Sequence, residues 1–324
     1  MAAAMSVAPK KLRWHNAFGA ANSADGLFRA VVFFFGGLLV MALIFIIVAA
    51  MATKSAESIG HFGWPFLWST AWDPVAKQFG ALPFIYGTVV SSFIGLIIAT
   101  PISLGVAIFI VELSPPWLGN AISVVVELLA AIPSVLLGLW AIFVMVPWLQ
   151  TSIEPLLIAH FGALPLFQGP PYGVGLLAAG LILAIMVTPT IVAISRDVMA
   201  TVPISQREAM IGLGATNWEA TTWAVLPYAR SGILGAIVLG LGRALGETMA
   251  VTMVIGNRPQ LSASILQPGY TMASVLANEF TNAGDNLYLS ALVEIGLLLF
   301  VVTIIMNGAA RILVWSTAHA SQQV

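Results

Sequence analysis

The sequence predicts an all-α integral membrane protein with six transmembrane helices, and three observations support this prediction. Of the 324 residues, 60% are hydrophobic and only 8% are charged. Mean hydropathy is +0.99, and a water-soluble domain of this composition could not hide its apolar surface from water. The chain also contains six apolar runs, each long enough to cross about 30 Å of hydrocarbon as a helix.

The spans are assigned in chain order. The uncharged run 30–53 is too long for the apolar core of a signal peptide and is interpreted as a retained first helix. It follows residues 1–28, a polar or mixed segment expected in the cytoplasm. Residues 29–324 are interpreted as one transmembrane domain with no appended soluble domain. The further spans are expected at about 83–111, 120–149, 173–195, 229–256 and 288–314.

Both ends of the chain are expected on one side of the membrane, because the number of spans is even. Positive charge identifies that side as the cytoplasm, since cytoplasmic loops carry the excess of lysine and arginine. The richer side holds Lys10, Lys11, Arg13, Arg29, Arg196, Arg207, Arg230 and Arg311, and the poorer side holds Lys54, Lys77 and Arg258. The rule therefore predicts cytoplasmic termini and a cytoplasmic loop at 196–228. The external loops are too short to form a binding domain.

Three spans contain a proline: Pro101 in the second, Pro133 in the third and Pro189 in the fourth. Proline removes a backbone donor and clashes with the preceding turn, so these helices are expected to be kinked or broken. Ordinary transmembrane packing explains any one of them. Together they suit a bundle that bends around a pathway.

Several function classes are excluded by composition and motifs. The net charge of −1 argues against nucleic-acid binding, which needs clustered Lys and Arg. The chain has no cysteine, so disulfides and thiol catalysis are excluded. It contains no phosphate-binding G-x-x-x-x-G-K-[ST] loop and is not expected to hydrolyse ATP itself. Scattered histidines and the lack of a G-x-S-x-G turn leave no metal, cofactor or catalytic residue to expect.

One polar segment interrupts the apolar sequence. Glu208–Ala209 is followed by Gly214, six residues after the glutamate, and by Leu226–Pro227, twelve residues after that glycine. This order predicts a helix start, a sharp turn, a second helix and a stop. A membrane protein with such a docking loop is expected to be driven by a partner on that side.

These residues match the cytoplasmic EAA loop of ABC-importer permeases. The chain departs from the family pattern at Met210, where a second alanine is usual, and at Ala224, where isoleucine is usual. Both departures keep a small or apolar helix face. The resemblance implies that residues 200–227, here called the coupling segment, form two short helices broken at Gly212 and Gly214. It also implies that the segment seats in a groove of a separate ATPase.

Two further strings narrow the resemblance. Residues 131–135, AIPSV, and residues 242–251, GRALGETMAV, followed by Ile255–Asn257, are similar to those of the PstC family of phosphate-importer permeases. The resemblance extends from about residue 84 to the C-terminus, and Met249–Val251 favours PstC over its sister PstA. It implies a type I ABC importer permease with the MetI-like fold, in a bacterial inner membrane. The implied partners are a PstA-like permease, a PstB-like ATPase dimer, a PstS-like binding protein, phosphate and membrane lipid.

Arg243 and Glu247 are the two charged residues of the expected spans that most strongly suggest a function. They are four residues apart in the fifth span, so their side chains are expected to touch. Either charge alone in hydrocarbon would cost about 2.5–3.5 kcal/mol or more, so both must face protein or water. One interpretation makes Arg243 a gating or phosphate-contacting cation held by Glu247. The other is mutual neutralisation as a structural pair.

Three further polar residues are secondary candidates for the translocation pathway: Glu127, Ser134 and Glu294. A pathway role and a structural polar contact both remain open for the two carboxylates. Five glycines on the fifth span suggest a thin helix side for packing against the partner permease. They are Gly232, Gly235, Gly240, Gly242 and Gly246.

The sequence therefore predicts a permease subunit that moves phosphate inward by alternating access, driven by ATP hydrolysed on another subunit. Two alternatives stay open. The same machinery could carry another oxyanion, such as sulfate or molybdate. A different class, an ATP-independent channel or secondary carrier, would need uptake that survives loss of the ATPase, and the EAA-like loop argues against it.

Overall fold

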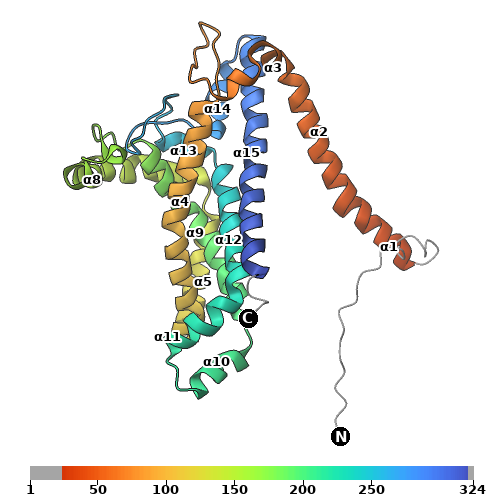
Figure 1. The fold of residues 1–324 in the computed structure, drawn as a ribbon, viewed down its shortest axis with the longest axis vertical. Coiled ribbons are helices and arrows are strands. Elements are labelled where there is room, and N and C mark those ends of the chain that lie inside the picture. Colours follow the sequence, from red (N-terminus) through yellow and green to blue (C-terminus); the bar gives the residue numbers. More distant parts are fainter. Residues whose placement is uncertain (1–23, 320–324) are drawn as a thin grey trace. The chain divides into compact units, whose positions relative to one another are not determined.

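A computed structural model describes residues 24–319 of the chain (Figure 1). These residues fall into two compact units, one ending at Lys54 and one beginning at Ser55. The first unit is a single helical run of α1 (Ala24–Phe33), η2 (Phe34–Leu38) and α2 (Leu39–Lys54). Its stretch Leu27–Lys54 contains an 18-residue window with a mean hydropathy of 3.1, which confirms the expected first span. Most of the expected 1–28 segment lies outside the described residues.

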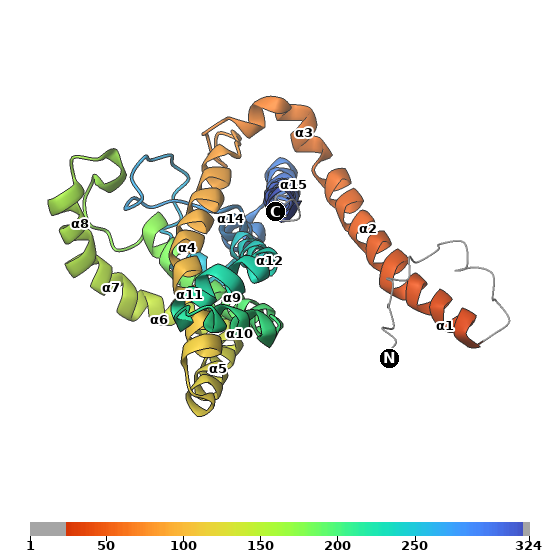
Figure 2. The same cartoon turned by 60° about the horizontal axis from the view of Figure 1, so that its bottom comes forward.

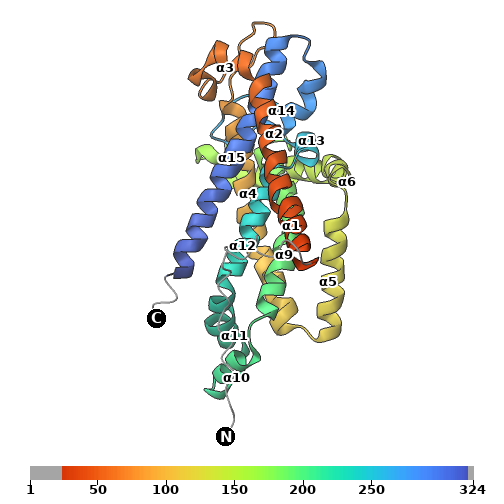
Figure 3. The same ribbon diagram turned by 90° about the vertical axis from the view of Figure 1, so that its right-hand side faces the viewer.

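The second unit is built around five long helices that run lengthwise beside one another (Figures 1 and 3). They are α4 (Leu82–Ile108), α5 (Pro116–Ala131), α9 (Leu176–Ala200), α12 (Leu226–Leu245) and α15 (Asn286–His319). One end of this bundle carries α3 (Ala56–Phe62), η3 (Trp64–Leu67), α14 (Met272–Glu279) and η9 (Phe280–Asn282). The opposite end carries α10 (Ile204–Gly212), α11 (Asn217–Ala220) and η8 (Thr221–Val225).

Six helices among the described residues are long and apolar enough to cross a membrane, as the sequence predicts. The expected third span, 120–149, is nevertheless wrong in its bounds. The helix breaks at Ile132–Pro133, because Pro133 cannot donate to the preceding turn and forces Ile132 into an extended conformation. Beyond the break the chain turns sideways from the bundle (Figures 1 and 2). That helical run comprises α6 (Ser134–Trp140), η5 (Ala141–Met145), α7 (Val146–Trp148), η6 (Leu149–Ile153) and α8 (Glu154–Phe161); a short helix, η7 (Pro165–Phe167), follows.

The other two prolines do not break their helices. Both α4 and α9 continue through Pro101 and Pro189. In contrast, the expected fifth span, 229–256, is interrupted without a proline: α12 ends at Leu245 and α13 (Met249–Val254) follows after three residues. Two of the long apolar segments are therefore discontinuous, as transporter helices are when they line a cavity.

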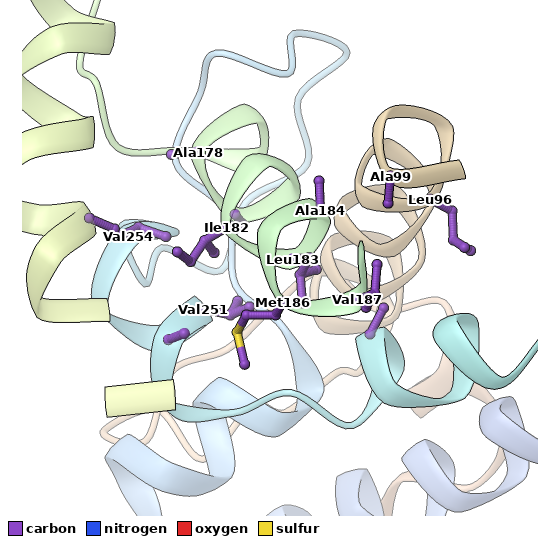
Figure 4. Packing of buried hydrophobic residues seen from close by; sticks show 14 of the residues in the cluster. Leu96, Ala99, Ala178, Ile182, Leu183, Ala184, Met186, Val187, Val251 and Val254 are labelled. Carbon is purple, nitrogen blue, oxygen red and sulfur yellow. The ribbon is translucent and has the colours of Figure 1, made fainter. Parts of the chain in front are cut away.

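The main core lies around α9. In the most apolar 18-residue stretch of this helix, 67% of the residues are buried. Figure 4 shows α9 side chains such as Ile182 and Leu183 between α4 and the valines of α13. Two of the five glycines expected to face a partner permease instead face α9. A Cβ at Gly232 would lie 2.4 Å from Val198, and one at Gly240 would lie 2.9 Å from Ile191. Their small size lets α12 approach α9 within the same chain.

The end of the unit that carries α3 and α14 is closed by aromatic side chains around a carboxylate. Glu279 accepts hydrogen bonds from Trp72 Nε1 at 2.8 Å and from the Tyr288 hydroxyl at 2.6 Å. Nearby, Lys77 contacts Asp285 at 2.6 Å, and this hydrogen bond holds the pKa of Asp285 below its usual range. These contacts tie the loops of this end to the start of α15.

Candidate functional site

The coupling segment lies beyond the bundle as a helix, a turn and a second helix (Figure 1). The first helix, α10, ends at Gly212, and Gly214 turns the chain with a φ of +92°. Thr216 and Glu219 then form a reciprocal capping box that starts α11. The predicted helix–turn–helix is therefore confirmed.

The predicted stop at Leu226–Pro227 is wrong. The helix runs without a break from Asn217 through η8 and α12 to Leu245. Pro227 falls in the first turn of α12, directly after the π-helical turn η8. Proline is tolerated at such a position because its missing donor is not needed for the regular α ladder there. The second half of the coupling segment, from Asn217 on, is consequently a continuous extension of α12, and α10 is joined to it through the turn at Gly214.

The tip of the coupling segment carries exposed apolar side chains. Leu213 is 85% exposed, Ile204 69% and Trp218 58%. Glu208 and Ala209 are exposed beside them on α10. A patch of exposed apolar side chains is typical of a protein interaction site.

Arg207, next to the expected motif, forms an ion pair with Glu112. Its Nη2 donates to Glu112 Oε1 at 2.8 Å, and its Nε lies 3.2 Å from each carboxylate oxygen. The same guanidinium donates to the backbone oxygens of Val202 at 2.6 Å and Met199 at 3.0 Å. Sequence reasoning missed Glu112. The available signal was a carboxylate at the end of the second span, on the side that the positive-inside rule also assigns to Arg207.

The two helix breaks lie close to each other because α6 packs on α13. A Cβ at Gly138 would lie 2.5 Å from Met253 Sδ and 3.1 Å from Ala250 Cα. The lack of a side chain at Gly138 thus lets the two half-helices touch. Ser134 begins α6, and Arg243 occupies the last turn of α12 just before the second break.

The expected contact between Arg243 and Glu247 is wrong. Glu247 lies in the break after α12, so the four-residue spacing of a continuous helix does not apply. Its Oε1 instead accepts from the Ala250 amide at 3.3 Å, at the start of α13. Among residues 24–319, Arg243 is exposed and forms no ion pair or hydrogen bond. An uncompensated guanidinium in a membrane helix must meet water, an anion or a partner protein.

The remaining candidates are dispersed. Glu127 is exposed on α5 and accepts from Arg196 at 3.4 Å beside a surface hollow of the bundle. Glu294 lies on α15 in the core near α3, only 7% exposed, and its Oε2 has no hydrogen-bond partner among the described atoms. Neither carboxylate is brought next to Arg243 by a contact seen in the described chain.

Comparisons with known proteins agree with this architecture. The family model described as "Binding-protein-dependent transport system inner membrane component" matches residues 99–317. The chain is 48% identical over 278 residues to the phosphate transport system permease protein PstC of Mesorhizobium japonicum, covering 85% of each chain. It is 48% identical over 294 residues to the PstC protein of Haemophilus influenzae, covering 90% of this chain and 93% of that one.

Solved structures give the fold independently. A chain of the MetNI methionine ABC transporter in an inward facing conformation aligns with a TM-score of 0.52 at 18% identity, covering 78% of this chain and 98% of that one. A second crystal form of the same transporter gives 0.55 at 17% identity, covering 76% of this chain and 99% of that one. The MetI-like fold is thus shared at low sequence identity. With the family match and the relatives above, the chain belongs to the binding-protein-dependent inner membrane permeases, and among these to the PstC family.

Proposed function

We propose that this chain is the permease subunit of an ATP-driven phosphate importer. It forms half of a transmembrane pathway with a PstA-like permease, and a PstB-like ATPase dimer hydrolyses the ATP. A PstS-like binding protein delivers phosphate from outside. The observation that carries the proposal is the coupling segment, which has an exposed apolar tip and whose second half continues into α12.

Coupling fits the geometry of this segment. Glu208, Ala209, Gly212 and Gly214 lie on α10 and its turn, and Leu226–Pro227 joins the segment to α12. A displacement of α11 by an ATPase is passed toward Arg243 along a helix that is continuous from Asn217 to Leu245. ATP binding can drive transport only if the ATPase contacts this tip differently in its two states.

The two breaks are the proposed translocation site. Arg243 is the cation best placed to meet a phosphate oxygen, because its guanidinium is exposed and has no partner in the described chain. Ser134 lies at the neighbouring break, and Glu247 holds the start of α13. Glu127 and Glu294 play supporting roles nearer the ends of the bundle.

The proposed orientation places the coupling segment in the cytoplasm of a bacterial cell. The end of α15 lies toward the same end of the bundle as α10 (Figures 1 and 3), which supports a cytoplasmic C-terminus. The positive-inside count supports the same assignment for both termini. The aromatic end around Glu279 then faces the binding protein.

The direct test is uptake in proteoliposomes that hold this chain with its partner permease and ATPase. Radiolabelled phosphate uptake and ATP hydrolysis are measured with binding protein and phosphate outside. Uptake that requires ATP, binding protein and phosphate together supports the proposal. Uptake of sulfate or molybdate instead would assign another oxyanion, and phosphate flux without ATP would refute the importer.

Gly214→Val is expected to abolish uptake while the protein still inserts in the membrane. A β-branched residue at a φ of +92° is strained, and the left-handed conformation costs about 1–2 kcal/mol even for less bulky residues. The turn must then open and the tip shifts. Gly60→Val is the matched control, since Gly60 lies in the helix α3 at the opposite end of the second unit and a Cβ at this position would meet no atom within 4 Å. Phosphate uptake and copurification of the ATPase are measured for each variant; wild-type uptake by Gly214→Val would contradict the prediction.

A further inference from the structure

The coupling segment is joined to two long helices by the chain itself. It follows α9 directly, and its second half continues into α12. Its link to α4 is of another kind, because Arg207 and Glu112 are 95 residues apart in sequence. The helix α10 packs on α11 and η8 and reaches the end of α4 through the Arg207 side chain.

We propose that the Arg207–Glu112 ion pair is the positioning link through which movement of α10 is transmitted to the corner between α4 and α5, and so to the helix break at Pro133. This inference rests on the proposed function. It adds a third route to the two covalent ones through α9 and α12. Neither residue contacts the substrate, so both are positioning residues.

The pair has the geometry of a fixed link. Two guanidinium nitrogens of Arg207 face the two oxygens of Glu112, which is the side-on arrangement that restricts rotation of both groups. The two side chains are only 19% and 10% exposed. Water and salt therefore screen this pair less than an exposed one. The Arg196–Asp197 pair of the same end provides the contrast, since its carboxylate is 69% exposed.

Arg207 is itself held by the backbone at the end of α9. Its bonds to the carbonyl oxygens of Met199 and Val202 satisfy groups left open where a helix ends. The side chains of these two residues are buried in one apolar cluster that α4, α9, η8 and α12 share. That cluster consists of Ala107, Val192, Met199, Val202, Val225, Ala229 and Ile233. The guanidinium is thus fixed at both sides, to α9 and to Glu112.

Glu112 lies at the corner between α4 and α5, where a displacement of its side chain can move the next helix. It belongs to the π-helical turn η4 (Phe109–Leu113), which ends α4 three residues before α5 begins. The corner is tightly built: the Ser114 hydroxyl donates to the Ile110 oxygen at 3.0 Å, and a Cβ at Gly119 would lie 2.7 Å from Ser114 Oγ. A displacement of Glu112 therefore moves the start of α5, whose other end is the break at Ile132–Pro133.

The test uses Glu112→Gln in the full complex with partner permease, ATPase and binding protein. This variant removes the charge but leaves the Arg207 bonds to the α9 carbonyls in place. We expect normal ATPase copurification, retained ATP hydrolysis, and a ratio of phosphate imported to ATP hydrolysed that falls at least about fivefold, the lower end of usual coupling energies. Asp197→Asn is the matched control and should keep the wild-type ratio. An unchanged ratio in Glu112→Gln overturns the inference.

A second variant covers the case in which Glu112→Gln assembles poorly. The chain has no cysteine, so Glu112→Cys with Arg207→Cys introduces the only two thiols of this subunit. A short bismaleimide that joins them should raise the phosphate-to-ATP ratio within one preparation, and failure to raise it overturns the inference. A wild-type complex that imports no phosphate refutes the proposed function together with the link. Normal wild-type coupling with unchanged variants refutes the link alone.

Discussion

Arg243→Ala is expected to lower the rate of ATP-driven phosphate uptake at least about tenfold. A tenfold change corresponds to a free-energy difference of roughly 1.4 kcal/mol. The reason is that an exposed guanidinium, which has no hydrogen-bond or ion-pair partner among residues 24–319, lies at the break between α12 and α13. A charge kept in a membrane helix at such cost marks a substrate or ion path. Its removal takes away the group that meets the anion but leaves the packing of α12 on α9 in place.

The measurement is uptake in proteoliposomes at equal amounts of purified complex. Arg243→Lys keeps the charge without the bidentate fork and should give intermediate uptake. Arg258→Ala removes an exposed arginine from the loop after α13 and should stay close to wild type. Unchanged phosphate flux in Arg243→Ala would reduce this arginine to a structural role. Loss of the complex itself would also contradict the prediction, which requires intact assembly.

Glu208→Lys is expected to abolish uptake through loss of ATPase binding. Glu208 is exposed on α10 beside the apolar tip, so reversal of its charge places a repulsive cation in the proposed contact without disturbing the fold. Like charges in an interface cost several kcal/mol. We expect the ATPase to be lost from the purified complex, with normal amounts of this subunit in the membrane.

The matched control is Glu57→Lys, the same change at an exposed glutamate on α3. It lies at the opposite end of the second unit and should leave the ATPase bound. Copurification and ATP hydrolysis measure both variants. A Glu208→Lys complex with normal ATPase content and normal uptake would show that α10 is not where the ATPase docks.

The number of spans and the positions of four of the six could be read from the sequence because hydrocarbon imposes a length and a composition on each helix. The turn at Gly214 could be read as well, since glycine is the residue that a left-handed turn selects. The effect of each proline could not. Pro101 and Pro189 lie in continuous helices and Pro133 does not, because neighbouring helices decide whether the freed backbone groups find partners.

The sequence by itself determined the class, the number of spans, the coupling segment and the PstC family, because these depend on composition and on local patterns. Tertiary structure alone decided which residues meet. It separated Arg243 from Glu247 by ending α12 at Leu245, and it paired Arg207 with Glu112 across 95 residues. The physical reason is that helix continuity and long-range pairing depend on packing between segments, which no local pattern records.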